Sequence, residues 1–181
     1  MKKRAGNSKD SKRLIFILIR YLILLASMFS LPIIYWIFTP ITSYLSFYLL
    51  KLFFNEVYIF NNMILISPET IIELIPACIA GSAYLLLLIL NLTVPMDFKK
   101  RIYSILGSFL LLLILNVLRI SILASLHKIN YELFNYTHLL FWYILSTIFV
   151  IGIWFFLAKA FSIKEIPIYT DFKYIISRTK K

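Results

Sequence analysis

Four apolar stretches of membrane-spanning length constrain this chain more than any other feature of its sequence. They cover residues 14–38, 77–95, 102–126 and 138–161. An α-helix rises about 1.5 Å per residue and the hydrocarbon core of a bilayer is about 30 Å thick, so each stretch has roughly the length of one crossing. The chain is 61% hydrophobic and 15% charged, whereas soluble domains are about 25% charged. We therefore predict an all-α polytopic membrane protein with a single membrane domain and four transmembrane helices.

The segment between the first two spans, residues 39–76, has a different pattern. Residues 41–54 are apolar but short for a crossing, which favours an interfacial or re-entrant helix. Residues 57–66, VYIFNNMILI, place two short runs of branched and aromatic residues around Asn61 and Asn62. This pattern is typical of a β-hairpin. Because an open sheet edge cannot face lipid, we expect the hairpin outside the hydrocarbon.

The basic residues predict which side of the membrane each segment faces. Outside the spans they lie in residues 1–13, 97–101 and 159–181, together with Lys51 and Lys128. If residues 41–54 do not cross, fifteen Lys and Arg face one side and two face the other. If they do cross, the counts become eight and nine. Cytoplasmic segments carry the excess of positive charge, so the first arrangement is favoured.

This arrangement predicts a multi-pass protein of the plasma membrane. Its basic N-terminal segment, residues 1–13, and its basic tail, residues 162–181, are both cytoplasmic, and residues 39–76 lie at the outer face. The net charge of +11 comes from clusters beside apolar runs, where it suits anionic lipid headgroups. We therefore expect no nucleic-acid partner.

Three reactive side chains converge near the outer ends of the spans in this orientation. Cys78 lies near the outer end of the second span, His138 begins the fourth, and Arg119 lies about 10 Å below the outer end of the third. A single cysteine excludes an intrachain disulfide, and the two histidines share no tight motif. We expect neither a metal nor a cofactor.

Arg119 is the most informative of these residues taken singly. It lies in LLLLILNVLRISILASL without another charge, where a central arginine costs about 2.5–3.5 kcal/mol on insertion scales and therefore indicates a partner or a function. Asn116 lies on the same helical face and is a supporting residue. One alternative is a structural ion pair of Arg119 with Glu69 or Glu73. His127 is a competing histidine in the same outer region.

The three residue types together favour acyl transfer on a peptide. A thiol attacks a carbonyl as the thiolate, which a guanidinium stabilises, while an imidazole accepts the proton and returns it to the leaving amine. The guanidinium can also stabilise the oxyanion of the tetrahedral intermediate. Cys78, Arg119 and His138 are therefore the candidate catalytic residues.

Three motifs in this order resemble the exosortase and archaeosortase transpeptidases. They are ACIAG at residues 77–81, NVLRI at 116–120 and THLLFW at 137–142, and the VYIFNNMILI hairpin resembles the segment that precedes the cysteine in that family. The resemblance covers about residues 40–160. In the common family pattern glycine is the second residue after the cysteine, whereas here Gly81 is the third. The short chain is most similar to the compact archaeal-type members.

The resemblance implies a specific activity. Cys78 would be the nucleophile, Arg119 the stabiliser of the thiolate or oxyanion, and His138 the acid/base. Apart from the resemblance, the residues themselves suggest Asn116, which could hold Arg119 in place, and Glu73 as supporting residues. The substrates would be exported surface proteins that end in a sorting signal made of a short motif, a membrane helix and a basic tail. The new carboxyl end would pass to a membrane lipid or another amine acceptor. The alternative from another class is a non-catalytic membrane scaffold or small transporter subunit in which Arg119 pairs with a glutamate.

Overall fold

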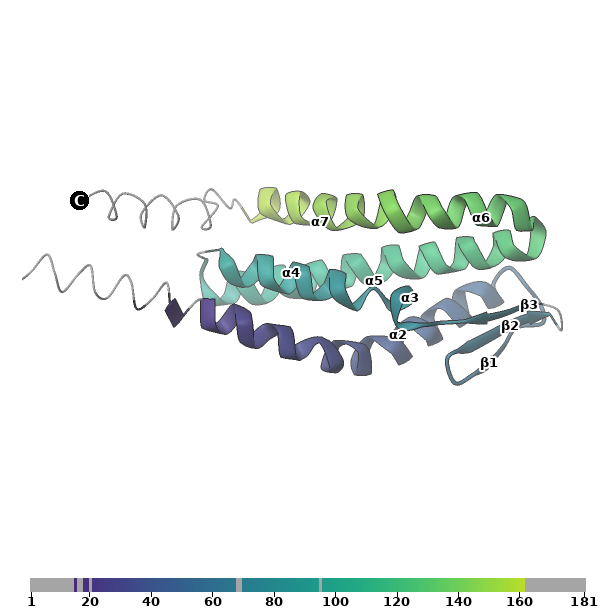
Figure 1. The fold of residues 1–181 in the computed structure, drawn as a ribbon, viewed down its shortest axis with the longest axis horizontal. Helices are drawn as coiled ribbons and strands as arrows, with labels where there is room; N and C mark the ends of the chain where they lie inside the picture. The colour runs from purple at the N-terminus through teal and green to yellow at the C-terminus, as the bar shows by residue number, and fades with distance from the viewer. Residues whose placement is uncertain (1–14, 16–17, 20, 68–69, 95, 162–181) are drawn as a thin grey trace, which may run out of the picture.

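A computed structural model describes residues 15–161 apart from residues 16–17, 20, 68–69 and 95, and only the backbone of Trp142. Both basic ends, residues 1–13 and 162–181, lie outside the described residues, as does Glu69. The described chain is a bundle of helices with one small sheet (Figure 1). Three helical segments are long and apolar enough to cross a membrane: Tyr21–Lys51, Phe98–Ile129 and Tyr131–Ala160. The prediction of a helical membrane protein is confirmed at this level.

The first long segment differs from its prediction. Residues 21–27 are helical and continue through the 3₁₀ turn η1 (Met28–Ser30) into α2 (Leu31–Lys51). The expected separate interfacial or re-entrant helix within residues 41–54 is wrong, because the chain stays helical past Pro40. Proline removes one backbone hydrogen bond and bends a helix, but helices packed among neighbours tolerate it. Figure 1 shows this bend in α2.

The second predicted span is shorter than expected and is broken. Its residues form α3 (Pro76–Ile79) and α4 (Gly81–Thr93), which meet at Ala80. Ala80 has φ 60°, in the left-handed region that ends a helix. The thirteen residues of α4 rise only about 20 Å, so α4 alone does not span the hydrocarbon. The described residues therefore contain three helices of spanning length rather than the predicted four.

The third and fourth spans are longer than predicted. α5 (Phe98–Ile129) extends residues 102–126 at both ends. After Asn130, whose side chain accepts a hydrogen bond from the Leu133 N–H, the chain reverses into α6 (Tyr131–Leu140). A π-helical turn, η2 (Phe141–Leu145), joins α6 to α7 (Ser146–Ala160) without interrupting the helix.

The predicted hairpin is present and carries a third strand. β1 (Tyr58–Phe60) pairs antiparallel with β2 (Met63–Ser67) across the Asn61-Asn62 turn, and Asn61 has φ 52°. Asparagine is one of the few residues that adopts this angle readily. β3 (Thr70–Glu73) pairs with the other edge of β2, giving the order β1-β2-β3.

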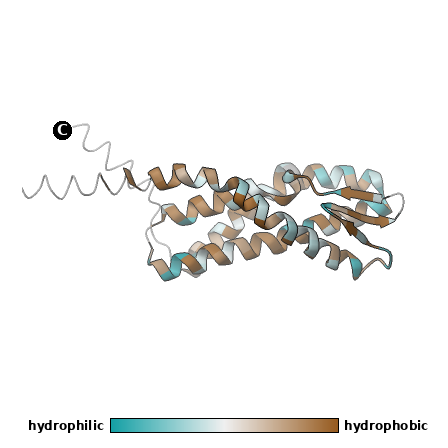
Figure 2. Cartoon of the chain, turned by 90° about the horizontal axis from the view of Figure 1, so that it is seen from below, coloured by the Kyte–Doolittle hydropathy of each residue, from teal (hydrophilic) through white to brown (hydrophobic). Residues whose placement is uncertain are grey.

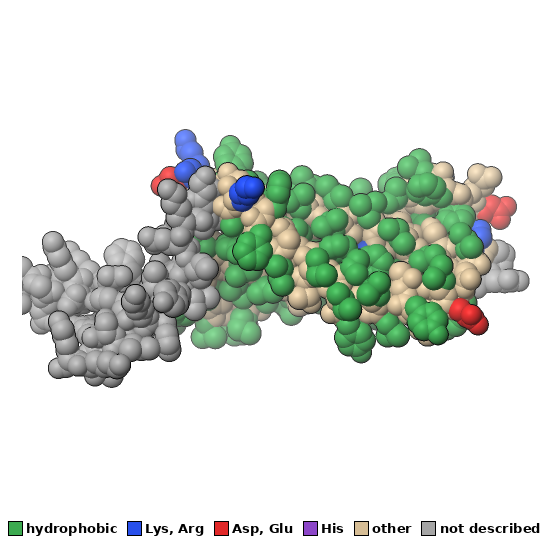
Figure 3. All heavy atoms as spheres, turned by 90° about the horizontal axis from the view of Figure 1, so that it is seen from above, with side chains coloured by type: hydrophobic (Ala, Val, Ile, Leu, Met, Phe, Trp, Pro, Cys, Tyr) green, Lys and Arg blue, Asp and Glu red, His purple; other side chains and the backbone are tan. Residues whose placement is uncertain are grey.

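The elements lie along one long axis (Figure 1). The start of the first helix, the connection between α4 and α5, and the end of α7 lie at one end, and the sheet and the α5–α6 turn lie at the other. Lys99, Lys100, Arg101 and Lys159 occupy the first end. Hydrophobic residues predominate along the elements between the two ends (Figure 2), and hydrophobic side chains cover much of the face that Figure 3 shows. Such a surface suits contact with lipid.

Two apolar cores hold the bundle together. The one at the sheet end joins the sheet to α2 and α5 through the buried side chains Leu50, Val57, Ile64, Ile66, Leu74, Ile79, Ile120 and Ala124. The other joins α2, α4, α5 and α7, with Tyr84 stacked on Phe38 at 4.0 Å between ring centroids. Cys78 packs against the first core, where the sheet, α3 and α5 meet.

Candidate functional site

The turn that carries Cys78 is short and tightly constrained. Pro76 begins α3, whose only four residues end at Ile79, and the Cys78 N–H donates to the Ile75 carbonyl at 2.8 Å. Ala80 then turns the chain into α4. A Cβ atom on Gly81 would lie 2.5 Å from Cζ of Tyr35, so a larger residue here would displace the Tyr35 ring of α2. Cys78 is therefore placed by the break between two helices rather than by a continuous span.

The break leaves carbonyls without helical partners, and α5 supplies donors for them. A helix leaves its last carbonyls without partners inside the helix. Asn116 donates through Nδ2 to the Cys78 carbonyl at 2.9 Å and to the Ile79 carbonyl at 3.4 Å. Arg119 donates through Nη2 to the same Cys78 carbonyl at 3.1 Å. Two side chains one turn apart on α5 thus hold the backbone of the cysteine.

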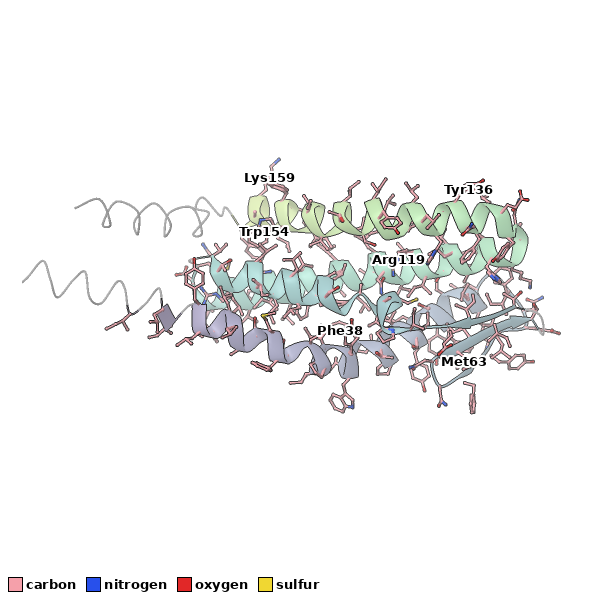
Figure 4. All side chains as sticks on the ribbon, in the orientation of Figure 1. Phe38, Met63, Arg119, Tyr136, Trp154 and Lys159 are labelled. Atoms are coloured by element: carbon pink, nitrogen blue, oxygen red, sulfur yellow. The ribbon has the colours of Figure 1, made fainter. Side chains whose placement is uncertain are left out.

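Arg119 is buried and has a donor to spare. Only 8% of its surface is exposed, and Figure 4 places it midway along the bundle, far from Lys159 at the end. Nη1 donates to Ser146 Oγ at 3.1 Å, and the buried Nε has no partner among the described residues. Cys78 lies close enough for thiol and guanidinium to interact electrostatically. A permanent cation therefore lies near Cys78, bound to its carbonyl, and its Nε has no partner among the described residues.

The π-helical turn explains how α7 reaches Arg119. Ser146 follows η2 directly, and its hydroxyl donates to the Phe141 carbonyl, five residues back, at 2.7 Å while accepting from Arg119. Such turns are rare and occur frequently at functional sites. Sequence analysis missed Ser146, because nothing in FWYILS distinguishes a π-helical turn from an α-helix.

One cavity joins the three predicted catalytic residues. It has a volume of about 330 Å³ and lies between β3, α3, α5 and α6. Cys78, Arg119 and His138 all line it. The remaining lining residues are Ile71, Ile72, Glu73, Leu74, Ile75, Ile120, Leu123, Ala124, His127, Tyr131, Phe134 and Phe141. The two supporting residues differ, because Glu73 lines the cavity whereas Asn116 acts on the Cys78 backbone from beside it.

The alternative ion pair of Arg119 with a glutamate does not form within the part of the chain that is described. Arg119 bonds a carbonyl and a hydroxyl there, and Glu73 is a neighbour in the cavity rather than its hydrogen-bond partner. Glu69, the other candidate, lies outside the described residues. Groups of three or more His, Cys, Asp or Glu side chains that could hold a metal ion are absent among the described residues.

Both histidines line the cavity, at different depths. The Phe134 ring lies between them, 4.9 Å from the His127 ring and 5.5 Å from the His138 ring. His138 follows Phe134 by one turn of α6, in the direction that leads to Ser146 and Arg119. His127 is eight residues beyond Arg119 on α5, or about 12 Å along the helix axis. Along the bundle axis, His138 is therefore the imidazole closer to the level of Arg119, and His127 lies closer to the α5–α6 turn.

A second cavity is also lined by Arg119. It has a volume of about 390 Å³ and is lined by Tyr35, Pro76, Ala77, Ala80, Ser82, Ala83, Arg119 and Ser146. Arg119 thus lines both the mostly apolar cavity that contains Cys78 and the cavity next to Ser146.

Comparisons with known proteins add no assignment. No family model, curated protein or solved structure matches the chain. The class of protein therefore rests on the fold and the site: a helical membrane protein with a thiol, a guanidinium and an imidazole around one cavity.

Proposed function

We propose that the protein is a membrane cysteine transpeptidase or peptidase that cleaves a C-terminal sorting signal of exported proteins. The observation that carries the proposal is the shared cavity of Cys78, Arg119 and His138. These residues come from three separate helices and were chosen from residue chemistry and charge pattern alone. An apolar cavity with a few convergent polar groups is the usual form of an active site.

The position of the cavity along the bundle supports peptide cleavage at a membrane surface. Arg119 lies eighteen residues beyond Arg101, the last basic residue at the other end of the helix. This separation is about 27 Å, close to the thickness of the hydrocarbon core. With the basic end of the bundle cytoplasmic, both termini face the cytoplasm and α3–α4 forms a fourth, partial crossing. The cavity then lies at the outer interface, where a substrate's helix emerges.

Each residue has a role in the reaction. The imidazole of His138 takes the proton of Cys78, and the thiolate attacks the scissile carbonyl carbon. The tetrahedral oxyanion collapses, the carbon–nitrogen bond breaks, and His138 returns the proton to the leaving amine. An amine acceptor then loses its proton to His138 and attacks the thioester, which frees the thiol. With water in place of the amine, the same thioester gives proteolysis.

Arg119 does two things in this scheme. Its charge stabilises the thiolate and the oxyanion, for which Nε is the uncommitted donor. Its Nη2 atom also fixes the backbone of the nucleophile, which holds the sulfur in one orientation. Asn116 shares the second task.

The resemblance to exosortases gains a geometric reason at the position where the motif departs from the common pattern. In the family pattern glycine is the second residue after the cysteine, and here that residue is Ala80, the one with φ 60°. Glycine adopts this angle without steric cost. A glycine at position 80, as in the family pattern, would therefore fit the observed backbone at a lower steric cost than alanine does.

A non-catalytic scaffold is the alternative, because the bonds from Arg119 and Asn116 to the Cys78 carbonyl would also serve packing alone. The scaffold predicts that the thiol is dispensable. The enzyme predicts that Cys78→Ala abolishes processing while the folded protein still accumulates.

The test compares the C-termini of exported membrane proteins, by mass spectrometry, in cells that contain the wild-type chain or Cys78→Ala. The enzyme predicts a set of proteins that lose a C-terminal helix and basic tail only with the wild type. Ser125→Ala, a small change on α5 outside the cavity lining, is the matched control and leaves processing intact. Equal sets of C-termini for the wild type and Cys78→Ala contradict the proposal.

A further inference from the structure

The edge of β3 that faces away from β2 carries unpaired backbone groups. The Leu74 N–H bonds the Asn62 carbonyl, and Ile64 stands opposite Ile72. Bonding pairs recur every second residue in an antiparallel ladder, so Ile72 and Leu74 turn their backbone groups toward β2. The backbone groups of Ile71 and Glu73 therefore point away from it.

The two-residue turn gives the same result independently. Phe60 and Met63 flank this turn, and in such hairpins the flanking pair is hydrogen-bonded. Met63 and Leu65 therefore bond β1, which leaves Ile64 to bond β3. β3 has no further strand beside it in the sheet. Among the described residues, no partner is present for the Ile71 N–H, the Ile71 carbonyl or the Glu73 N–H.

This unpaired edge borders the candidate active site. β3 contacts α5, and Ile71 and Glu73 line the same cavity as Cys78. Figure 1 shows β3 as the strand on the α5 side of the sheet, leading directly to α3. The cavity walls are mostly apolar. The strand edge offers main-chain donors and acceptors that have no partner among the described residues, and it lies beside apolar walls. This combination suits an extended peptide better than a lipid tail, because a lipid tail cannot form hydrogen bonds.

We propose that the substrate binds as an added strand along β3, parallel to it, with its scissile bond beyond Glu73 and next to Cys78. This inference rests on the proposed function. A sorting signal runs from the exported domain outside toward its membrane helix inside. β3 runs in the same direction, from Thr70 at the sheet end toward α3. The substrate strand is therefore parallel to β3, and the Ile71 N–H and carbonyl bond two different substrate residues.

Binding geometry is measured without catalysis, in the Cys78→Ala chain reconstituted in phosphatidylcholine vesicles. The probes are synthetic peptides with ten randomised residues, a twenty-residue Leu/Ala helix and a four-lysine tail. The sequence that binds most tightly is then resynthesised with one cysteine at each successive position of its extended part. Each cysteine peptide is mixed with the Cys78→Ala chain that also carries Ile71→Cys or Glu73→Cys. Copper phenanthroline then oxidises neighbouring peptide and protein cysteines to a disulfide cross-link.

A parallel added strand gives a fixed register. The peptide position that links to Glu73→Cys lies two residues C-terminal to the one that links to Ile71→Cys. An antiparallel strand reverses this order, and a cavity filled by lipid or by an irregular peptide gives links without a two-residue spacing. Either of these results overturns the proposal.

A second variant tests the hydrogen bond itself in the active chain. Ile71→Pro removes an N–H that β2 does not use, and proline is tolerated at such an edge. It should raise KM for the same peptide about tenfold with little change in kcat, the loss of roughly one main-chain hydrogen bond. Ile71→Ala, which keeps the N–H, is the control and should change KM less. Equal KM values for the two variants contradict the proposal.

These measurements separate the inference from the proposed function. Links in parallel register without cleavage by the wild type leave the binding mode standing and remove the enzyme. Cleavage by the wild type together with antiparallel or irregular cross-links supports the enzyme and overturns the proposed binding mode.

Discussion

Two polar clusters lie within the same apolar bundle. They differ in charge and in how many of their polar groups have hydrogen-bond partners. The inner cluster consists of Asn91, Ser104 and Ser108, which join α4 to α5 near the basic end. All three are fully buried, and each side chain has a partner. The outer cluster, around Arg119 and Cys78 near the sheet end, contains a cation with one donor that has no partner among the described residues, and Arg119 lines two cavities.

The difference separates structural polar groups from a site. Uncharged side chains that satisfy one another stabilise a membrane bundle modestly. A buried donor that lacks a partner among the described residues costs stability and calls for an explanation, which a bound ligand would supply at Arg119. The side chains of the inner cluster satisfy one another, whereas Nε of Arg119 in the outer cluster does not find a partner among the described residues. Nε of Arg101, at the basic end, is a second such donor.

The largest effect is expected for Arg119→Lys. Lysine keeps the charge but cannot bond the Cys78 carbonyl and Ser146 together as a planar fork does. Processing per folded molecule should fall about 100-fold or more, as when a single donor to an oxyanion is lost. Arg101→Lys, where Nη2 bonds the Val94 carbonyl at 3.0 Å, is the matched control and should leave the rate unchanged. Equal processing rates for Arg119→Lys and Arg101→Lys would contradict the claim that the outer cluster has a catalytic role.

Gly81→Ala should destabilise the fold. The new Cβ would meet the Tyr35 ring at 2.5 Å, and overpacking of this kind costs about 1–3 kcal/mol. Thermal unfolding in detergent measures the loss. Adding Tyr35→Ala removes the ring and should restore part of the stability that Gly81→Ala costs, and an equal loss in both backgrounds would show that this contact is not the cause.

Asn91→Ala should reduce stability while sparing activity. It removes the hydrogen bonds of the inner cluster to Ser104 and Ser108, each worth about 0.6 kcal/mol on average in membrane bundles. The unfolding temperature should fall measurably, and processing per folded molecule should stay the same. A lower rate in folded Asn91→Ala would mean that the inner cluster serves the reaction as well.

The smallest effect is expected for Ala80→Gly. Alanine at φ 60° is strained by about 1 kcal/mol, and glycine relieves that strain while the unfolded chain gains freedom. The unfolding temperature should therefore stay the same or rise slightly, and processing should be retained. A clear loss of stability would show that this backbone turn is not the one that residues 76–81 adopt.

The sequence predicted the helical membrane class and the hairpin at Asn61-Asn62 because both depend on local patterns. Apolar runs of spanning length and a pair of asparagines between branched residues need no distant contact to be read. The boundaries were predicted less well. The short apolar run of residues 41–54 predicts a separate interfacial or re-entrant helix, but packing of α2 against its neighbours keeps the helix continuous through Pro40.

For the candidate site, the sequence predicted that Cys78, Arg119 and His138 lie near one another, but it did not predict their contacts. Cys78, Arg119 and His138 could be chosen because reactive groups are rare in apolar spans, and all three line one cavity. The bonds from Arg119 and Asn116 to the Cys78 carbonyl could not be foreseen, because they depend on the break at Ala80. Alanine gives no sequence signal for a left-handed residue, and the register that brings Ser146 to Arg119 depends on a π-helical turn.

The central claim is that Cys78 becomes acylated by the substrate, and intact-mass spectrometry of the purified protein tests it most directly. The protein is quenched with acid during turnover of a cleaved peptide. A thioester on Cys78 should add the mass of the N-terminal fragment, disappear with neutral hydroxylamine, and be absent from Cys78→Ala. Cleavage of the peptide by Cys78→Ala at the wild-type rate, with no adduct on the wild type, would contradict the claim.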